Sequence, residues 1–240
     1  MTRNRLIREY HGASRCQNPF VTLPEQLDIL DKSLTHVHDL GWTDLAVQKG
    51  AQDMNMPETY AQIFEKPALA LVLHFYDKCN GLTADKLKSI DRSTNFSSSS
   101  EFVKEGIRFR LSLLEPYVAS WSQAMGLLSW PENIPVSCRF LYSFIDDIVF
   151  LSGDRSTDLN WYSKRLLVAG IYEATLLHLI QDSSPDYSDT WDFLDRRFDD
   201  VENFDTITRQ ITLVSGGLPQ TLIAAVETAK NVVGMNSTNR

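Results

Sequence analysis

Histidines are the side chains of this sequence best suited to metal binding or proton transfer, and their spacing argues against both. The five are His11, His36, His38, His74 and His178. None belongs to an HExxH or ExxH motif, which would bring an imidazole and a carboxylate together on one helix face. His36 and His38 stand two positions apart, so on a helix they point to different sides. The sequence therefore predicts no metal and no cofactor.

The neighbouring carboxylates of Asp146 and Asp147 suggest binding of Mg²⁺ and diphosphate, but such sites need repeated carboxylates and this pair is followed by the apolar Ile148–Phe150. We interpret both as solvated or helix-capping residues, because Gly153–Asp154 marks a turn close behind. The sequence also lacks a G-x-S-x-G motif and a glycine-rich phosphate loop. Its three cysteines are too few and too scattered for a disulfide framework. We predict a non-catalytic protein.

The charge of the chain opposes nucleic-acid binding. The formal net charge is −8, whereas a DNA-binding or RNA-binding surface must be basic to displace counterions from phosphates. The first 24 residues hold four arginines and one acidic residue, so the remainder is more acidic still. Residues 1–20 lack the apolar core of a secretory signal and are typical of a mitochondrial transit peptide, with a disordered tail as the alternative.

Apolar residues recur at helical spacing through the rest of the chain, without strand-like alternation of any length. Helices are expected over residues 23–39, 44–54, 58–65, 68–79, 102–114, 117–128, 135–151 and 161–180, with a polar stretch over 80–100 that ends in an exposed serine loop. The helix over 161–180 is apolar on most of its circumference and is expected to lie centrally.

The first three helices form a helix-turn-helix-like head, but residues 43–65 carry four acidic residues against one lysine. A recognition helix there would meet phosphate with the wrong charge. We predict an all-α bundle with a three-helix head that does not bind DNA.

A helical body of this kind can enclose an apolar ligand between its helices. Large apolar side chains on the expected central helices are the candidates for the pocket lining: Trp121, Met125, Phe140, Phe144, Leu167 and Ile171. The alternative is that these side chains simply fill the core.

The segment 182–201 combines a helix start at Pro185, several aspartates and aromatic residues. Helical periodicity puts Trp191, Leu194, Phe198 and Val201 on one stripe and Phe193 on roughly the opposite side. One aromatic side must therefore face something other than the core. Trp191 is either part of the core or an anchor for a partner.

The C-terminal region divides into a polar spacer, 202–217, and a two-faced helix, 218–236. The apolar residues of the helix that could enter a membrane surface are Leu218, Leu222, Ile223, Val226, Val232 and Val233. Docking onto the chain's own body or onto a second copy is the alternative.

Two blocks of sequence and the C-terminal apolar helix together resemble the family of ubiquinone (coenzyme Q) biosynthesis accessory proteins numbered nine. The blocks are LGWTDLAVQKGAQDMNMP, residues 40–57, and GDRSTDLNWYSKRLLVAGIYEATLLHLIQDSSPDYSDTWDFLDRRFDDV, residues 153–201. The resemblance implies a TetR-regulator-like helical fold over residues 23–201 that has lost DNA binding, located in the mitochondrial matrix against the inner membrane.

The resemblance also implies function. A protein of this family binds a polyprenylated quinone-precursor lipid, reaches the bilayer through its C-terminal helix, and hands the lipid to the demethoxyubiquinone hydroxylase. Other subunits of the ubiquinone-biosynthesis complex, and a second copy of the chain, are further expected partners. Carried onto this sequence, the surface that binds the hydroxylase comprises Asp186, Tyr187, Trp191, Leu194 and Arg197. The competing classes are a TetR-type ligand-sensing transcription regulator and a small helical enzyme acting on the quinone ring.

Overall fold

A computed structural model describes residues 18–153 and 159–200, and within these ranges the protein is all-α, without a β-strand. The N-terminal head comprises α2 (Pro24–Leu34), α3 (Val37–Leu40), α4 (Asp44–Asp53) and the 3₁₀ helix η1 (Glu58–Ile63). The body comprises α5 (Pro67–Ser89), α6 (Arg92–Asn95), α7 (Ser99–Ser112), η2 (Glu115–Tyr117), α8 (Val118–Ser129), α9 (Ile134–Leu151), α10 (Leu159–Gln181), η3 (Pro185–Tyr187) and a last described helix over residues 188–200. Among the described residues, no helix is long and apolar enough to cross a membrane.

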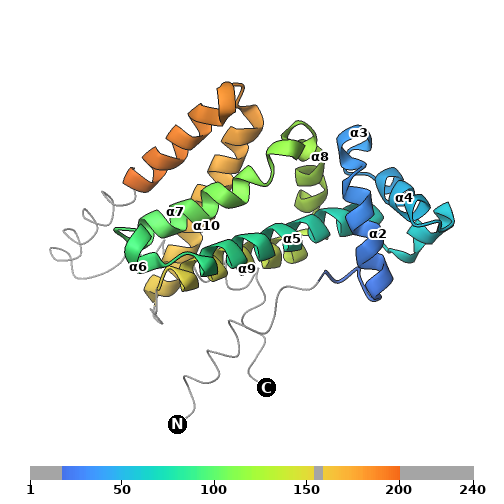
Figure 1. The fold of residues 1–240 in the computed structure, drawn as a ribbon, viewed down its shortest axis with the longest axis horizontal. Helices are drawn as coiled ribbons and strands as arrows, with labels where there is room; N and C mark the ends of the chain where they lie inside the picture. Colours follow the sequence, from blue (N-terminus) through green and yellow to red (C-terminus); the bar gives the residue numbers. More distant parts are fainter. Residues whose placement is uncertain (1–17, 154–158, 201–240) are drawn as a thin grey trace, which may run out of the picture.

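Helix α5 connects the head to the body. Pro67 lies in its first turn, where the missing N–H costs no hydrogen bond. Figure 1 shows α2, α3 and α4 gathered at one end of α5, whereas α7 and α9 run beside the rest of it. All side chains from Leu69 to Tyr76 are buried, because α5 has neighbours on several sides.

The prediction that this helix would end at Cys79 was wrong, because α5 continues to Ser89. Two of the polar residues beyond Cys79 are buried and have hydrogen-bond partners. The Asn80 amide donates to the Phe140 carbonyl oxygen at 3.2 Å, and the Thr83 hydroxyl donates to the Cys79 carbonyl oxygen at 2.8 Å. Polar residues with such partners remain compatible with a helix interior.

The head differs from the prediction in its first and third helices. The helix expected over 23–39 is divided, since α2 ends at Leu34 and α3 begins at Val37. The third helix is the 3₁₀ helix η1, in which residues three apart lie on one side. Accordingly Ala61 and Phe64 are both buried. The second helix, α4, is capped by the Thr43 hydroxyl, which accepts from the Ala46 N–H.

The serine run before α7 is a helix start and not an exposed loop. The Ser98 hydroxyl accepts from the Glu101 N–H at 3.1 Å, and the Glu101 carboxylate accepts from the Ser97 N–H at 2.7 Å. These reciprocal contacts closely resemble a capping box, with the returning bond made one residue before the cap.

Helix α10 does not lie centrally as predicted, because one of its faces is open. Leu166, Leu167 and Leu177 are 43, 41 and 47 % exposed, whereas Tyr172 and Leu179 on the other side are buried. The buried face is fastened to α9 by an ion pair that the sequence interpretation missed.

That ion pair joins the Arg165 Nε to the Asp146 Oδ1 at 2.6 Å, and the two side chains are only 4 and 14 % exposed. Asp146 is therefore neither a solvated nor a capping residue. A carboxylate at this depth is held by a cation and does not stand open to a metal.

Candidate ligand pocket and partner surface

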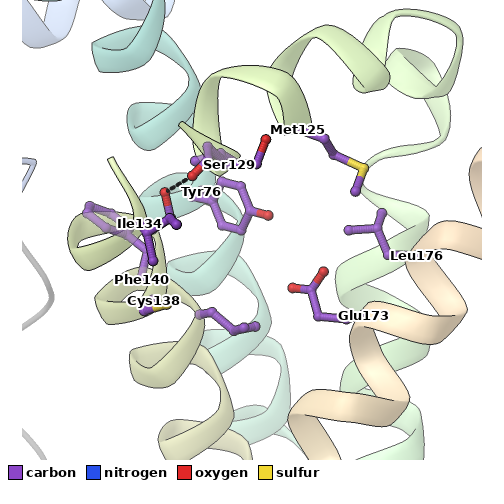
Figure 2. A pocket seen from close by; sticks show the side chains of 11 residues that line it. Tyr76, Met125, Ser129, Ile134, Cys138, Phe140, Glu173 and Leu176 are labelled. Carbon is purple, nitrogen blue, oxygen red and sulfur yellow. Dashed lines mark hydrogen bonds between the residues drawn. The ribbon is translucent and has the colours of Figure 1, made fainter. Parts of the chain in front are cut away.

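A cavity of about 210 Å³ lies between α5, α8, α9 and α10. Figure 2 shows its side chains converging from these four helices. Most of the wall is apolar, and the full lining comprises Tyr76, Met125, Leu128, Ser129, Ile134, Ser137, Cys138, Phe140, Leu141, Glu173 and Leu176. A mostly apolar wall with a few polar groups is typical of a site for a hydrophobic ligand.

Three of the lining residues carry groups that could ionise, and burial keeps each of them closer to its neutral form. Burial raises the pKa of Tyr76 well above its ordinary value, and Tyr172 raises it further. Burial also raises the pKa of Glu173, although the Arg110 guanidinium acts in the opposite direction. The pKa of the Cys138 thiol is raised by burial and by Glu173. The pocket wall is thus polar at a few points with little charge.

A fully buried cation lies beside the pocket without lining it. The Arg110 guanidinium stands 4.8 Å from the centre of the Tyr76 ring and 5.8 Å from that of Phe144. Its Nε donates to the Asn80 Oδ1 at 3.1 Å, whereas its two terminal nitrogens have no hydrogen-bond partner among the described residues. The Tyr172 side chain, also buried, lies near Tyr76 and contributes to the raised pKa of Tyr76.

The structure places the predicted pocket residues in three different environments. Met125 and Phe140 line the cavity. Trp121, Phe144 and Ile171 are buried in the core at 0, 2 and 6 % exposure, and Leu167 is 41 % exposed on the open face of α10. Tyr76 and Glu173 were not predicted. A helical projection of each helix would find the pairs Met125–Leu128 and Glu173–Leu176, which are spaced by three residues, but would not show which face meets the cavity.

The arrangement is suited to binding. In the described residues no group of three or more His, Cys, Asp or Glu side chains could hold a metal ion. Cys138 and Glu173 lie in the same wall, and the raised pKa of Cys138 disfavours the thiolate that a nucleophile needs.

The predicted partner surface is partly assembled. Asp186 and Tyr187 adopt positive φ values of 53° and 54° in η3. The Trp191 indole N–H donates to the Asp186 carbonyl oxygen at 3.1 Å, and the Arg108 guanidinium stands 5.4 Å from the Trp191 ring centre. These residues form one surface at the start of the last described helix.

The other two residues of the predicted surface lie apart from this group. Leu194 is fully buried and belongs to the core. The Arg197 guanidinium stands 5.1 Å from the Phe193 ring, which in turn stacks on the His178 ring at 4.7 Å. Arg197 therefore extends toward the side of the helix that carries Phe193.

Asp182 fixes the start of this helix together with the Ser184 hydroxyl, which accepts from the Asp189 N–H at 3.1 Å. Its carboxylate accepts from the Ser184 N–H at 2.7 Å, the Thr190 N–H at 2.9 Å and the Thr190 hydroxyl at 2.5 Å. Burial alone would raise the pKa of Asp182, but the hydrogen bonds from Thr190 and Ser184 outweigh it and hold the pKa well below its ordinary range. The spacing of eight residues between Asp182 and Thr190 across a proline turn gives no familiar capping motif.

The remaining predicted site, the membrane-facing helix with Leu218, Leu222, Ile223, Val226, Val232 and Val233, lies outside the described residues. The same holds for most of the predicted transit peptide. The described chain begins inside that segment at Asn18, which is buried and whose side-chain amide donates to the Ala70 carbonyl oxygen at 2.8 Å.

The fold and the site define the class: an all-α protein with a largely apolar cavity between its helices. Comparison with known proteins gives the family. The sequence model of the COQ9 family matches residues 134–205. "Ubiquinone biosynthesis protein COQ9, mitochondrial" of Rattus norvegicus is 37 % identical over 213 residues, covering 87 % of this chain and 68 % of the relative.

Two further relatives agree. The human protein with the same name is 36 % identical over 219 residues, covering 88 % of this chain and 69 % of its own. "Probable ubiquinone biosynthesis protein coq9, mitochondrial" of Dictyostelium discoideum is 38 % identical over 181 residues, covering 73 % of this chain and 59 % of its own. The chain belongs to the COQ9 family.

Proposed function

We propose that this protein is a non-catalytic accessory protein of ubiquinone biosynthesis that binds polyprenylated quinone precursors and presents them to the demethoxyubiquinone hydroxylase. Membership of the COQ9 family supports the pathway, since its relatives are named ubiquinone biosynthesis proteins. The same names describe those relatives as mitochondrial. We further propose that this chain works at the matrix face of the inner membrane, as the family resemblance implies.

The cavity between α5, α8, α9 and α10 is the observation that carries the lipid-binding proposal. Removing apolar surface from water contributes about 25 cal/mol per Å², so an apolar wall such as that of Leu128, Leu141 and Leu176 favours an isoprenoid over a soluble metabolite. Its volume of about 210 Å³ is smaller than the roughly 300–1,000 Å³ of sites that enclose a drug-sized ligand. The pocket accordingly holds one part of a polyprenyl lipid while the remainder extends beyond it.

Lipid extraction tests the proposal directly. The full chain is purified from a membrane-containing preparation and extracted with organic solvent, and isoprenoid quinones are sought by mass spectrometry. Recovery of such lipids in a molar ratio near that of the protein is expected. An extract free of isoprenoid lipids, or sequence-specific DNA binding that persists at physiological salt, contradicts the proposal.

Liposome flotation tests the proposed role of the C-terminal helix. Deletion of residues 218–236 is expected to abolish flotation with vesicles, because that segment supplies the apolar residues that would enter the bilayer. A matched control replaces Lys230 with Gln, which leaves the apolar face intact. If the deletion leaves flotation unchanged, this segment does not mediate membrane binding.

A further inference from the structure

Two oxygen-bearing side chains face each other across the cavity. Tyr76 comes from α5 and Glu173 from α10, and both point into the pocket (Figure 2). The wall around them is mostly apolar and includes Met125, Phe140 and Leu176. A purely hydrocarbon ligand has no use for either polar group, and each would lose contact with water when such a ligand entered.

The side chain behind Tyr76 holds the tyrosine in place. Arg110 lies 4.8 Å from the Tyr76 ring centre, within the range of a cation–π contact, and is itself fixed by its hydrogen bond to Asn80. Asn80 is anchored in turn by its bond to the Phe140 carbonyl oxygen at 3.2 Å. This chain of contacts crosses α5, α7 and α9, so the orientation of the Tyr76 ring is set by three helices.

We propose that the Tyr76 hydroxyl and the Glu173 carboxyl bind an oxygen atom on the ring of the ligand. The pocket then selects an isoprenoid that carries an oxygenated aromatic or quinone ring over a ring without oxygen on the same tail. This inference rests on the proposed lipid-binding function and specifies which end of the lipid the pocket holds. Arg110 acts as a positioning residue, through Tyr76.

The chemistry of the two groups suits a ring oxygen. The high pKa of Tyr76 keeps its hydroxyl protonated, so it can donate to a quinone carbonyl at any physiological pH. Glu173 accepts from a phenolic O–H when ionised and donates to a carbonyl when protonated. The small cavity agrees with this assignment, because a ring with a short length of tail occupies far less space than a complete polyprenyl chain.

Selectivity between two matched probes is the measurement. Farnesyl-trimethyl-1,4-benzoquinone, whose fully substituted ring does not readily add thiols, and the matching trimethylated farnesylbenzene share the tail and the six-membered ring and differ in the ring oxygens. Binding of each to the full chain is measured by competition against a fluorescent isoprenoid. The native protein is expected to bind the quinone at least tenfold more tightly, since unpaired buried polar groups penalise the hydrocarbon.

Replacing Tyr76 with Phe removes one hydroxyl and keeps the ring over Arg110. It is expected to reduce the preference for the quinone by about three- to tenfold, with the trimethylated farnesylbenzene bound as well as before or better. Glu173→Met is expected to act in the same direction. The matched control is Tyr117→Phe, because the Tyr117 ring packs against Trp42 and Phe75, outside the pocket lining.

Thiol labelling locates the probe. Cys138 lies in the pocket wall, so a bound quinone or hydrocarbon is expected to slow its alkylation by N-ethylmaleimide, as followed by peptide mass spectrometry. If neither probe binds the native protein, the proposed lipid-binding function itself fails. Three other results leave lipid binding in place but overturn the proposed recognition of the ring oxygen. These are equal affinity of the native protein for the two probes, an unchanged preference for the quinone in folded Tyr76→Phe and Glu173→Met, and a lack of protection of Cys138.

Discussion

Replacing Arg165 with Met removes one partner of the buried ion pair between α9 and α10. The remaining Asp146 carboxylate is 14 % exposed and loses its contact at 2.6 Å. Removing one member of a buried pair typically costs about 3–5 kcal/mol, because the other charge is left uncompensated. Asp146 and Arg165 each take part in further interactions, so removing Arg165 does not leave the Asp146 carboxylate without any contact. We therefore expect a loss of about 3 kcal/mol in the free energy of unfolding.

Urea denaturation followed by far-ultraviolet circular dichroism measures this loss. The matched control is Lys88→Met, which breaks the ion pair between the Lys88 Nζ and the Asp85 Oδ1 at 3.9 Å. The side chains of Lys88 and Asp85 are 60 and 66 % exposed. That change is expected to alter the free energy of unfolding by less than about 0.5 kcal/mol.

The double variant Asp146→Leu/Arg165→Met separates charge from packing. Removing both charges is expected to restore most of the stability that Arg165→Met loses, since the Asp146 carboxylate is then removed together with its Arg165 partner. If instead the double variant is no more stable than Arg165→Met, or if Arg165→Met costs no more than Lys88→Met, the ion pair does not hold α10 against α9.

Four further variants test other parts of the structure. Asp182→Ala is expected to cost about 1 kcal/mol by removing a helix cap, seen as faster hydrogen exchange over residues 188–200. Because the folded-state pKa of Asp182 is lowered, the stability it contributes is present above the ordinary pKa of 3.8 and is lost as the pH falls below it. Gly50→Ala is expected to destabilise the protein, because the new Cβ would lie 2.7 Å from the Ile29 carbonyl oxygen. Gly170→Ala places its Cβ where nothing lies within 4 Å, and it is expected to stabilise α10 by about 0.5–1 kcal/mol. Thermal melts in which Gly50→Ala is the more stable of the two variants contradict this. Trp191→Ala is expected to weaken hydroxylase association by about 2 kcal/mol at an unchanged melting temperature, and a lowered melting temperature with unchanged association would assign Trp191 to the core.

Helical periodicity located most of the body because the signal is local. The expected helices over 117–128, 135–151 and 161–180 correspond to α8, α9 and α10 within two residues at each end. The second half of α5 was missed because its evidence is not local. Asn80 is tolerated inside a helix by virtue of a carbonyl oxygen sixty residues away, at Phe140.

The pocket was harder to predict than the helices that form it. Size and hydrophobicity identify core residues, and Trp121 and Phe144 are indeed buried. The lining of the cavity, however, depends on how α8, α9 and α10 pack together, which the sequence of each helix does not specify. It includes the polar Tyr76 and Glu173. A prediction that considers only apolar residues as pocket lining does not select polar residues that lie on a mostly apolar helix face.

The position of Trp191 follows from a shift of one residue in the buried stripe. Thr190, Leu194 and Phe198 are buried, at a spacing of four residues, and Thr190 takes the place that periodicity offered to Trp191. A threonine can occupy it because the Asp182 carboxylate accepts from both its N–H and its hydroxyl. Trp191 is thereby rotated to the rim of the core, half-buried, with its indole N–H bonded to the Asp186 carbonyl oxygen. An aromatic ring held in this orientation before any partner arrives loses little conformational entropy on binding, which is the property that favours tryptophan as an interface anchor.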